Sequence, residues 1–481
     1  MILHRLPYII YRSYSDFGYL TDNRNYGYDT ASHSCLKVGD LLLSKVANIF
    51  YSVLSNSPQD IETIVSKLYQ YYPEVSPSVI REDAIGFYTD LQKKGFLSIG
   101  FDEDNTINYN RTKYFSYENR QPFELNLAQE QASCSTYIDT LGKACQLTRV
   151  HIDISGCCNE NCIHCYIPSD YKHGIMSKEL FEDILLQCVD MHVINVTISG
   201  GEPMLNPHLT DFLQLCKKYN FSINLLSNLT LLSDEMLDLF EDTPLLSVQT
   251  SLYATEGEVH DSITQSKGSC LKTLSSINRL YERNIPMQIN CPIMKQNLYY
   301  YKDVLKFARS MNIEADSDYS LFGCYDHSKS NLACRLSIDE IEKIIHDDVG
   351  SDTKRKDSEK KRKDSKTPIC PVCKTSLCIS NSGNIYPCEG WQSLSLGNIK
   401  NQSLRKIWEE SPMVQYLREL TYGHFLKCNS CQDKKYCTPC LIMNANEDSS
   451  GNLFNINPLI CEIARIKKEV YCPPVAMAAK M

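Results

Sequence analysis

Three closely spaced cysteines near the middle of the chain have the side chains and the spacing for metal chemistry. They stand in the segment Cys158-Asn-Glu-Asn-Cys162-Ile-His-Cys165, a C-x3-C-x2-C spacing. Three thiolates can hold three corners of a four-iron cluster, because [4Fe–4S] clusters take cysteine ligands. The fourth iron then keeps an open position for a small molecule, as a catalytic metal does. The spacing therefore indicates a reactive metal site.

At the level of this motif, three alternative origins of the cysteine spacing stay open. His164 could complete a zinc site as its fourth ligand. Cys157 could begin a plant-type ferredoxin loop with C-x4-C-x2-C spacing, which also needs a distant fourth cysteine. The third alternative is chance clustering, because the chain contains 23 cysteines.

A second motif follows the next apolar segment. Residues 193–199, Val-Ile-Asn-Val-Thr-Ile-Ser, read as a buried strand that runs directly into Gly200-Gly201-Glu202-Pro203. Two glycines at a strand end bring bare backbone close to a ligand, and Glu202 adds a carboxylate that can meet an ammonium group. An ordinary strand-to-helix turn would also account for the same residues.

Together the two motifs resemble the radical SAM superfamily, with His164 as the aromatic residue of the pattern C-x3-C-x-aromatic-C. The resemblance implies a [4Fe–4S] cluster held by Cys158, Cys162 and Cys165. It also implies that S-adenosylmethionine (SAM) binds the open iron with its amino group near Gly200, Gly201, Glu202 and Pro203. Cleavage of SAM would give a 5′-deoxyadenosyl radical, with no catalytic residue beyond the cluster ligands, since the cofactor carries the chemistry.

The elements that must position these motifs alternate between strands and helices from residue 147 onward. The strands are expected at 150–154, 193–199, 222–226, 246–251, 287–292 and 317–321, and the helices at 177–191, 209–219, 233–240, 269–282 and 298–311. Six such units predict an α/β fold with a parallel sheet, a partial (β/α)6 TIM-like barrel. Both motifs then lie on one rim, because ligands sit at the carboxyl ends of the strands.

Further polar residues follow later strands on the same rim. Ser227 and Asn228 end the third strand and Ser251 ends the fourth, so they are candidate SAM contacts, although strand-end capping accounts for them equally well. His260 and Asp261 are tempting as an acid and a base, but a structural role is favoured for both.

The first 110 residues contain no cysteine motif. A hairpin is expected at 8–20, helices at 41–54, 61–72 and 76–94, and a returning strand at 95–99, which together predict a winged-helix-like module. The module resembles the peptide-recognition element in front of many radical SAM peptide maturases, which is similar to the peptide chaperone of pyrroloquinoline quinone biosynthesis. The resemblance implies that the leader of a precursor peptide adds as a strand to the hairpin edge.

Ten cysteines lie between residues 370 and 472. Cys370 precedes Gly383-x4-Cys388, and Cys428-x2-Cys431-x5-Cys437-x2-Cys440 precedes a distant Cys461. Two zinc ribbons are one possible source of this pattern. The pattern resembles the SPASM extension of peptide-modifying radical SAM enzymes, although that family ends its quartet with C-x3-C. The resemblance implies two auxiliary [4Fe–4S] clusters, one held by Cys370, Cys388, Cys440 and Cys373, and the other by Cys428, Cys431, Cys437 and Cys461. Cys378 and Cys472 are left over.

Composition limits the remaining classes of protein. The 481 residues carry a net charge of −9, which disfavours a nucleic-acid partner, and no apolar run is long enough to cross a membrane. The start of the chain lacks the features of a signal peptide, so a cytoplasmic location is expected, where clustered cysteines indicate metal or catalysis. The domains are expected at 1–110 (recognition module), 111–146 (bridge), 147–335 (radical SAM core), 336–369 (helix and charged linker) and 370–472 (SPASM).

The sequence thus predicts an oxidoreductase that matures a ribosomally made precursor peptide by forming a thioether or carbon–carbon crosslink. Its expected cofactors are SAM and three [4Fe–4S] clusters, and its expected partners are the precursor peptide with its leader and a reductant such as flavodoxin or ferredoxin. Two alternatives stay open: modification of a protein such as a sulfatase by formylglycine formation, and a non-catalytic, zinc-bearing peptide-binding protein.

Overall fold

The computed structural model describes residues 1–22, 40–100, 117, 141, 144–347 and 364–472. Most of the expected bridge at 111–146 and of the charged linker at 352–366 lies outside these residues. No helix among the described residues has both the length and the apolar character to cross a membrane.

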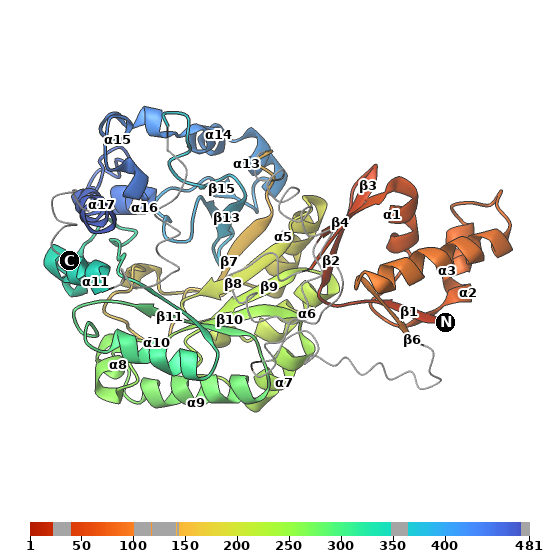
Figure 1. The fold of residues 1–481 in the computed structure, drawn as a ribbon, viewed down its shortest axis with the longest axis horizontal. Coiled ribbons are helices and arrows are strands. Elements are labelled where there is room, and N and C mark those ends of the chain that lie inside the picture. The colour runs from red at the N-terminus through yellow and green to blue at the C-terminus, as the bar shows by residue number, and fades with distance from the viewer. Residues whose placement is uncertain (23–39, 101–116, 118–140, 142–143, 348–363, 473–481) are drawn as a thin grey trace.

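The centre of the molecule is a sheet whose first six strands pair in parallel in the order β12-β11-β10-β9-β8-β7, with helices packed along its outside (Figure 1). The strands are β7 (Arg149–Ser155), β8 (Asn195–Gly200), β9 (Ser222–Leu226), β10 (Leu245–Ser251), β11 (Met287–Pro292) and β12 (Glu314–Asp318). The helices are α5 (Lys178–Asp190), α6 (Leu209–Lys218), α7 (Asp234–Asp242), α8 (Gly257–Thr264), α9 (Ser269–Glu282), α10 (Tyr301–Ser310) and α11 (Ile338–Asp347). The predicted parallel α/β core is confirmed, although β12 begins three residues before the predicted strand.

Alternation along β7 shows why the sheet separates two environments. Val150, Ile152 and Ile154 are buried among the aliphatic and aromatic side chains of the surrounding helices. The residues between them, His151 and Asp153, are polar and project to the opposite face, since side chains alternate along a strand. The inside of the partial barrel is therefore polar, whereas the helix-facing side is the hydrophobic core.

The sheet continues beyond β7 into the C-terminal segment, which the sequence does not predict. Strand β13 (Ser376–Ile379) pairs in parallel with β7, and β14 (Asn384–Tyr386) and β15 (Gly397–Asn398) follow in antiparallel pairing. The partner strands β7 and β13 are more than 200 residues apart in sequence. The cysteine-rich segment is thus joined to the core by backbone hydrogen bonds.

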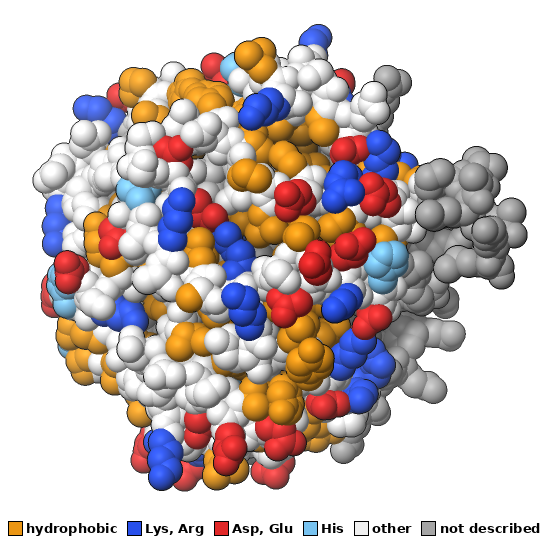
Figure 2. Space-filling model, turned by 90° about the vertical axis from the view of Figure 1, so that its left-hand side faces the viewer, with side chains coloured by type: hydrophobic (Ala, Val, Ile, Leu, Met, Phe, Trp, Pro, Cys, Tyr) orange, Lys and Arg blue, Asp and Glu red, His pale blue; other side chains and the backbone are white. Residues whose placement is uncertain are grey.

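Helices cover the remainder of the C-terminal segment. They are α13 (Leu404–Glu410), α14 (Pro412–Glu419), α15 (Leu426–Asn429), α16 (Leu441–Glu447) and α17 (Pro458–Tyr471). Figure 2 shows the face of the molecule farthest from the N-terminal module, where cationic and anionic side chains are mixed and apolar side chains lie between them. No continuous basic surface is visible among the described residues of this face.

The N-terminal module forms a lobe at one end of the barrel (Figure 1). Its strands are β1 (Ile2–Arg5), β2 (Ile9–Ser13), β3 (Phe17–Asp22), β4 (Asp40–Ser44), β5 (Gln59–Asp60) and β6 (Leu97–Gly100), and its helices are α1 (Lys45–Ser52), α2 (Ile61–Tyr69) and α3 (Pro77–Lys93). They form two sheets, with orders β5-β1-β6 and β2-β3-β4. The predicted hairpin and helices are present, with one correction.

The correction concerns residues 41–44, for which the sequence predicts a helix. These residues form β4, which pairs with β3, and the helix begins only at Lys45 with Ser44 as its N-cap. A short apolar run fits a strand or a helix equally well by periodicity, and here pairing with a distant strand decides the outcome. The sequence also missed β1.

Two side chains fix this module to the barrel. The buried Arg12 donates from Nε to the Val193 carbonyl (2.8 Å) and from Nη1 to the Asn220 carbonyl (2.9 Å). The amide of Asn220 accepts from the backbone N–H of Tyr11 and donates to the carbonyl of Ile9. Asn220 thereby caps the outer edge of β2 as a neighbouring strand would.

Candidate active site

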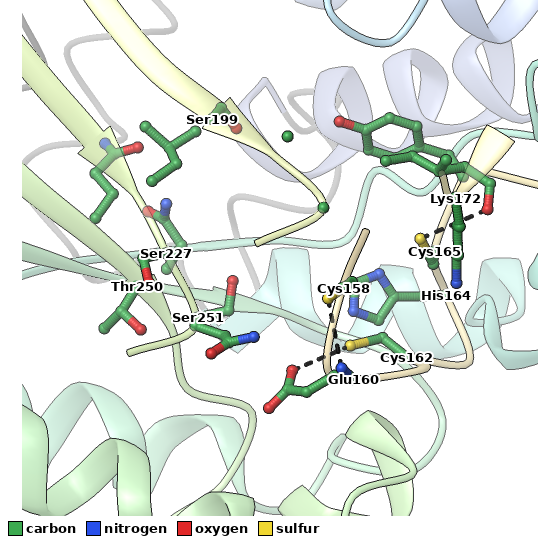
Figure 3. A pocket seen from close by; sticks show the side chains of 18 of the residues that line it. Cys158, Glu160, Cys162, His164, Cys165, Lys172, Ser199, Ser227, Thr250 and Ser251 are labelled. Atoms are coloured by element: carbon green, nitrogen blue, oxygen red, sulfur yellow. Dashed lines mark hydrogen bonds between the residues drawn. The ribbon is translucent and has the colours of Figure 1, made fainter. Parts of the chain in front are cut away.

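The cysteine triad lies on the loop that follows β7, at the carboxyl end of the sheet. Two backbone hydrogen bonds fasten this loop to the end of α8, from Asn161 to the Thr264 carbonyl (3.0 Å) and from Ile163 to the Ile263 carbonyl (2.9 Å). The thiols of Cys158, Cys162 and Cys165 all face one cavity of about 240 Å³ (Figure 3). The structure therefore brings the three predicted ligands together beside an open space.

Burial keeps the thiols of Cys158 and Cys162 protonated while no metal is bound. It raises the pKa of the Cys158 thiol to about 11, and the pKa of Cys162 is raised further by burial and by the neighbouring Glu160. Metal binding at such thiols releases protons and supplies the positive charge that the buried thiolates lack.

The distances between the ligand atoms distinguish the kinds of metal site. Bound to one zinc ion at about 2.0–2.3 Å, four ligand atoms lie within about 4 Å of one another. Among the described residues, His151, Asp153 and Cys378 bring their ligand atoms within 4.8 Å of one another. The cysteine triad with His164 does not form such a group. The triad with His164 therefore does not have the short ligand spacing of a single zinc ion.

The two glycines of the second motif are required by the packing of the loop. A Cβ on Gly200, whose φ is +133°, would lie 2.2 Å from the carbonyl oxygen of Ser155, and one on Gly201 would lie 2.3 Å from that of Cys157. The Gly201 N–H donates to the Ser155 carbonyl at 2.7 Å. These glycines thus bring the end of β8 against the cysteine loop, and both also line the cavity.

Glu202 has a different place from the one expected. Its carboxylate is fully buried and accepts hydrogen bonds from the backbone N–H of Met204 (3.0 Å), the hydroxyl of Ser227 (2.7 Å) and the backbone N–H of Asn228 (2.8 Å). Neither Glu202 nor Pro203 is among the residues that line the cavity, whereas Ser227, Asn228 and Ser251 are. The Glu202 carboxylate therefore ties the ends of β8 and β9 together.

Glu160, between the first two cysteines, is the acidic residue among those lining the cavity. Only 8% of it is exposed, and burial raises the pKa of its carboxyl group to about 7, with the charges of Glu202 and Asp261 adding to the effect. One oxygen accepts from the Cys162 thiol at 3.5 Å, and the other, although buried, has no hydrogen-bond partner among the described residues. The sequence analysis did not select this residue, and the signal it offered was an acidic residue between two cysteines of the motif.

Tyr253 lines the same cavity and links two histidines behind the cysteine loop. Its hydroxyl lies 2.9 Å from Nε2 of His164, and its backbone N–H donates to Nδ1 of His260 at 3.3 Å. Burial lowers the pKa of each histidine to about 4, so both rings are neutral. The structural role favoured for His260 agrees with this arrangement.

The side chain of Asp261 binds backbone N–H groups. Its carboxylate accepts from the N–H groups of Gly268 and Cys270 and from the hydroxyl of Ser269. These bonds fix the start of α9, which is the structural role expected for Asp261.

A second cavity, of about 380 Å³, adjoins the first and shares Ile167, Gly200 and Gly201 with it. It opens between the end of β7 and the β13–β14 turn. Asp153 on its wall accepts hydrogen bonds from His151 (3.1 Å), Gln392 (2.7 Å) and the Cys378 thiol (3.7 Å). The left-over Cys378 is thus buried beside β7, at the seam between the core and the C-terminal segment.

The other C-terminal cysteines separate into two groups. A charge on Cys440 contributes to the raised pKa of Cys370. A charge on Cys370 contributes in the same way to the raised pKa values of Cys388 and Cys373. In the other group, charges on Cys461 and Cys431 contribute to the raised pKa of Cys428. The pKa of Tyr422 is raised by burial and by its neighbours Cys428, Cys431 and Cys437. Members of each predicted set therefore lie near one another, and Cys378, which belongs to neither set, lies near Cys388.

Comparisons with known proteins bear on both regions. Residues 152–308 match the model of the radical SAM superfamily, and residues 370–441 match that of the SPASM iron–sulfur cluster-binding domain. The chain is 27% identical over 303 residues to the antilisterial bacteriocin subtilosin biosynthesis protein AlbA of Bacillus subtilis, a match covering 60% of this chain and 66% of AlbA. It is 24% identical over 319 residues to the AdoMet-dependent heme synthase of Methanosarcina barkeri, covering 60% of this chain and 89% of that protein.

A solved structure resembles nearly the whole chain. The structure of Streptococcus suis SuiB bound to the precursor peptide SuiA aligns with a TM-score of 0.56 at 16% identity and covers 95% of this chain and 99% of SuiB. At this identity the likeness concerns the fold, and its coverage includes the N-terminal module. The two domain matches and the convergence of the cysteine triad on a cavity agree: this chain is an enzyme that contains a radical SAM domain and a SPASM iron–sulfur cluster-binding domain.

Proposed function

We propose that this enzyme matures a ribosomally synthesised precursor peptide by closing a thioether or carbon–carbon crosslink in it. The observation that carries the proposal is the N-terminal module, which is fixed to the barrel through Arg12 and Asn220 and whose strand β4 has no strand on its outer edge among the described residues. The role of AlbA in bacteriocin biosynthesis and the peptide bound to SuiB support the same substrate class. The match to the heme synthase leaves a small-molecule substrate as the competing possibility.

The leader of the peptide is proposed to add to the outer edge of β4. In the sheet β2-β3-β4, strand β3 is central and Asn220 caps the outer edge of β2. Among the described residues no strand pairs with the outer edge of β4. Leu42 on β4 and Val46 on α1 are more than half exposed, so an added strand would find apolar contacts as well as backbone partners.

We assign the cofactors as SAM and three [4Fe–4S] clusters. Cys158, Cys162 and Cys165 would hold the cluster that binds SAM, with Gly200, Gly201, Ser227, Asn228 and Ser251 around it. Cys370, Cys373, Cys388 and Cys440 would hold one auxiliary cluster, and Cys428, Cys431, Cys437 and Cys461 the other. When bound, SAM and its cluster supply a 5′-deoxyadenosyl radical, which removes a hydrogen atom from the substrate.

The residues of the chain itself would position and shield this reaction. The second cavity adjoins the first at Gly200 and Gly201, so a peptide segment seated there lies next to bound SAM. Its wall offers polar groups from both the core and the C-terminal segment, among them Asp153 and Gln392. These groups would orient the reacting residue. A flavodoxin or ferredoxin is the proposed reductant, and the cytoplasm the proposed location.

The test uses the anaerobically reconstituted protein with SAM, a reductant and the peptide encoded by the short open reading frame nearest its gene. We expect the peptide to lose two hydrogens and tandem mass spectrometry to locate a new crosslink, with the leader required for efficient turnover. The C162A variant serves as the inactive control. An unchanged peptide alongside intact SAM cleavage, or conversion of a sulfatase-derived cysteine peptide to formylglycine instead, would contradict the proposal.

A metal analysis tests the cofactors separately. About 12 iron atoms and matching sulfide per chain are expected for three four-iron clusters. About two zinc ions with little sulfide would contradict the cluster assignment.

A further inference from the structure

Three side chains that can bind a metal meet on the inner face of the sheet, and none of them belongs to the cysteine sets described above. Cys378 on β13 pairs with His151 on β7, and Asp153 follows His151 by two residues. His151 and Asp153 project from the same face, since side chains alternate along a strand. The pairing of β7 with β13 (Figure 1) therefore places an imidazole, a carboxylate and a thiol side by side.

The distances between the ligand atoms of this group suit a single metal ion. Nε2 of His151 lies 3.1 Å from Oδ1 of Asp153, and the sulfur of Cys378 lies 3.7 Å from Oδ2 of the same carboxylate. All three ligand atoms lie within 4.8 Å of one another. Around a tetrahedral zinc ion with bonds of about 2.0–2.3 Å, neighbouring ligand atoms are about 3.3–3.7 Å apart. An ion of this size therefore fits between the side chains with little movement of the two strands.

Hydrogen bonds hold the group together before an ion binds. The Asp153 carboxylate lies within hydrogen-bond distance of the His151 ring and accepts from the Cys378 thiol and from the Gln392 amide, the last at 2.7 Å. The thiol and the ring nitrogen bind a metal in their deprotonated forms, whereas Gln392 can keep its bond to the carboxylate. A side chain that orients a ligating carboxylate in this way is a common feature of metal sites.

The types of ligand atom select the kind of ion. Calcium and magnesium take oxygen ligands, whereas a set of one sulfur, one nitrogen and one oxygen suits zinc and similar transition metals. A carboxylate and a thiolate together also balance the two positive charges of such an ion. Because Cys378 is fully buried, the thiolate would bind the ion from the protein side of the group.

The fourth position around the ion would face the second cavity. Asp153 and Gln392 line this cavity of about 380 Å³, which adjoins the cofactor cavity at Gly200 and Gly201. Catalytic zinc sites have three protein ligands and keep the fourth position for water or substrate. The side chains of the group thus match a site of this open kind.

We propose that His151, Asp153 and Cys378 bind one zinc ion whose open position faces the second cavity. That position takes a water molecule or a donor atom of the molecule bound in the cavity. The ion is additional to the three proposed clusters, and its binding requires neither SAM nor a peptide.

The test loads the anaerobically reconstituted protein with zinc, removes weakly bound ions by gel filtration with a chelator, and counts zinc and iron per chain. The wild type should retain about one zinc ion beside about 12 iron atoms. C378S and H151Q should lose the zinc and keep the iron. C216S, which changes a buried cysteine on α6, is the matched control and should retain both metals.

X-ray absorption at the zinc edge identifies the ligands in the wild type, so the test does not depend on the folding of a variant. One sulfur at about 2.3 Å and the other ligands, nitrogen or oxygen, at about 2.0–2.2 Å are expected. A shell of four sulfurs would place the zinc in an emptied cluster site and overturn the proposal. A wild type without zinc, or zinc retained in C378S or H151Q, would also overturn it. So would loss of about four iron atoms in C378S, since Cys378 would then be a cluster ligand.

Discussion

The cysteines of the barrel and those of the C-terminal segment differ in what surrounds them. In the barrel, three thiols face a cavity of about 240 Å³ that polar residues also line. In the C-terminal segment, the thiols lie next to one another in two groups, and Cys370, Cys388 and Cys428 belong to or pack against the hydrophobic core. Three ligands beside a cavity suit chemistry, whereas the predicted sets of four cysteines would suit stability and electron transfer.

The largest effect should follow from removing a thiol of the open site. C162A should form no detectable 5′-deoxyadenosine when reduced in the presence of SAM, because two thiolates do not hold the cluster. Chromatography of the reaction products gives the measurement. C188A, which changes a buried cysteine of the core, is the matched control and should retain SAM cleavage. Wild-type cleavage in C162A would remove the distinction between the two regions.

A strong effect is also expected from the backbone that supports the open site. In G201A the new Cβ would meet the Cys157 carbonyl at 2.3 Å, so the cysteine loop must shift at a cost of about 3 kcal/mol. Iron at the barrel site and SAM cleavage should both fall.

A glycine elsewhere gives the control for G201A. In G86A, on α3, the added Cβ meets nothing within 4 Å, and the variant should be as stable as the wild type or more stable by about 1 kcal/mol. Equal thermal stability and equal iron content of G201A and the wild type would show that the close approach of β8 and the loop is not required.

Removal of a thiol from one of the two C-terminal cysteine groups should have a different effect on the enzyme. C431A should lose about four of about 12 iron atoms and melt at a lower temperature, since its group is expected to contribute folding energy. SAM cleavage should persist, while crosslinking of the peptide is lost. Iron analysis, calorimetry and product analysis check the three parts. Complete loss of SAM cleavage with the barrel cluster intact would contradict the division of roles.

The smallest effect concerns the pH dependence of stability beside the open site. His260 is buried and neutral, and burial lowers its pKa to about 4 from the usual 6.5. Between these two pKa values, His260 binds a proton in the unfolded chain but not in the folded chain. The contribution of neutral His260 to the free energy of unfolding is therefore fully present above pH 6.5 and is lost as the pH falls toward 4. The loss between pH 7 and pH 5 should be about 2 kcal/mol.

The comparison of His260 with glutamine isolates this contribution. H260Q keeps an acceptor for the Tyr253 N–H but has no group that titrates in this range. Denaturant titrations measure the free energy of unfolding at pH 7 and at pH 5. Its decrease between these pH values should be about 2 kcal/mol smaller in H260Q than in the wild type. The same pH dependence in both proteins would mean that His260 is not held neutral.

Much of the core could be predicted because its signals are local. The spacing of Cys158, Cys162 and Cys165 and the Gly-Gly-Glu-Pro segment identified the radical SAM domain, and alternating apolar segments located β7 to β11 to within two residues. Periodicity reports which face of a segment is buried, and strand length and glycine placement report where it ends.

The remaining features were decided by contacts between residues far apart in the chain. The sequence could not show that β13 extends the sheet beside β7, since no local pattern names a partner strand. The same holds for β4, where pairing with β3 overrode a helical pattern. The inward turn of Glu202 toward Ser227 and Asn228, which leaves Glu160 as the acidic residue that lines the cavity, also exists only once β8 and β9 lie side by side.

The sequence by itself therefore determined the two domain types, the order of most elements of the core and the residues capable of chemistry. The tertiary structure decided which of those residues face the cavity and which hold the frame. The physical reason is that the chemical identity of a side chain is local, whereas its burial and its hydrogen-bond partners depend on strands that pair across the whole chain.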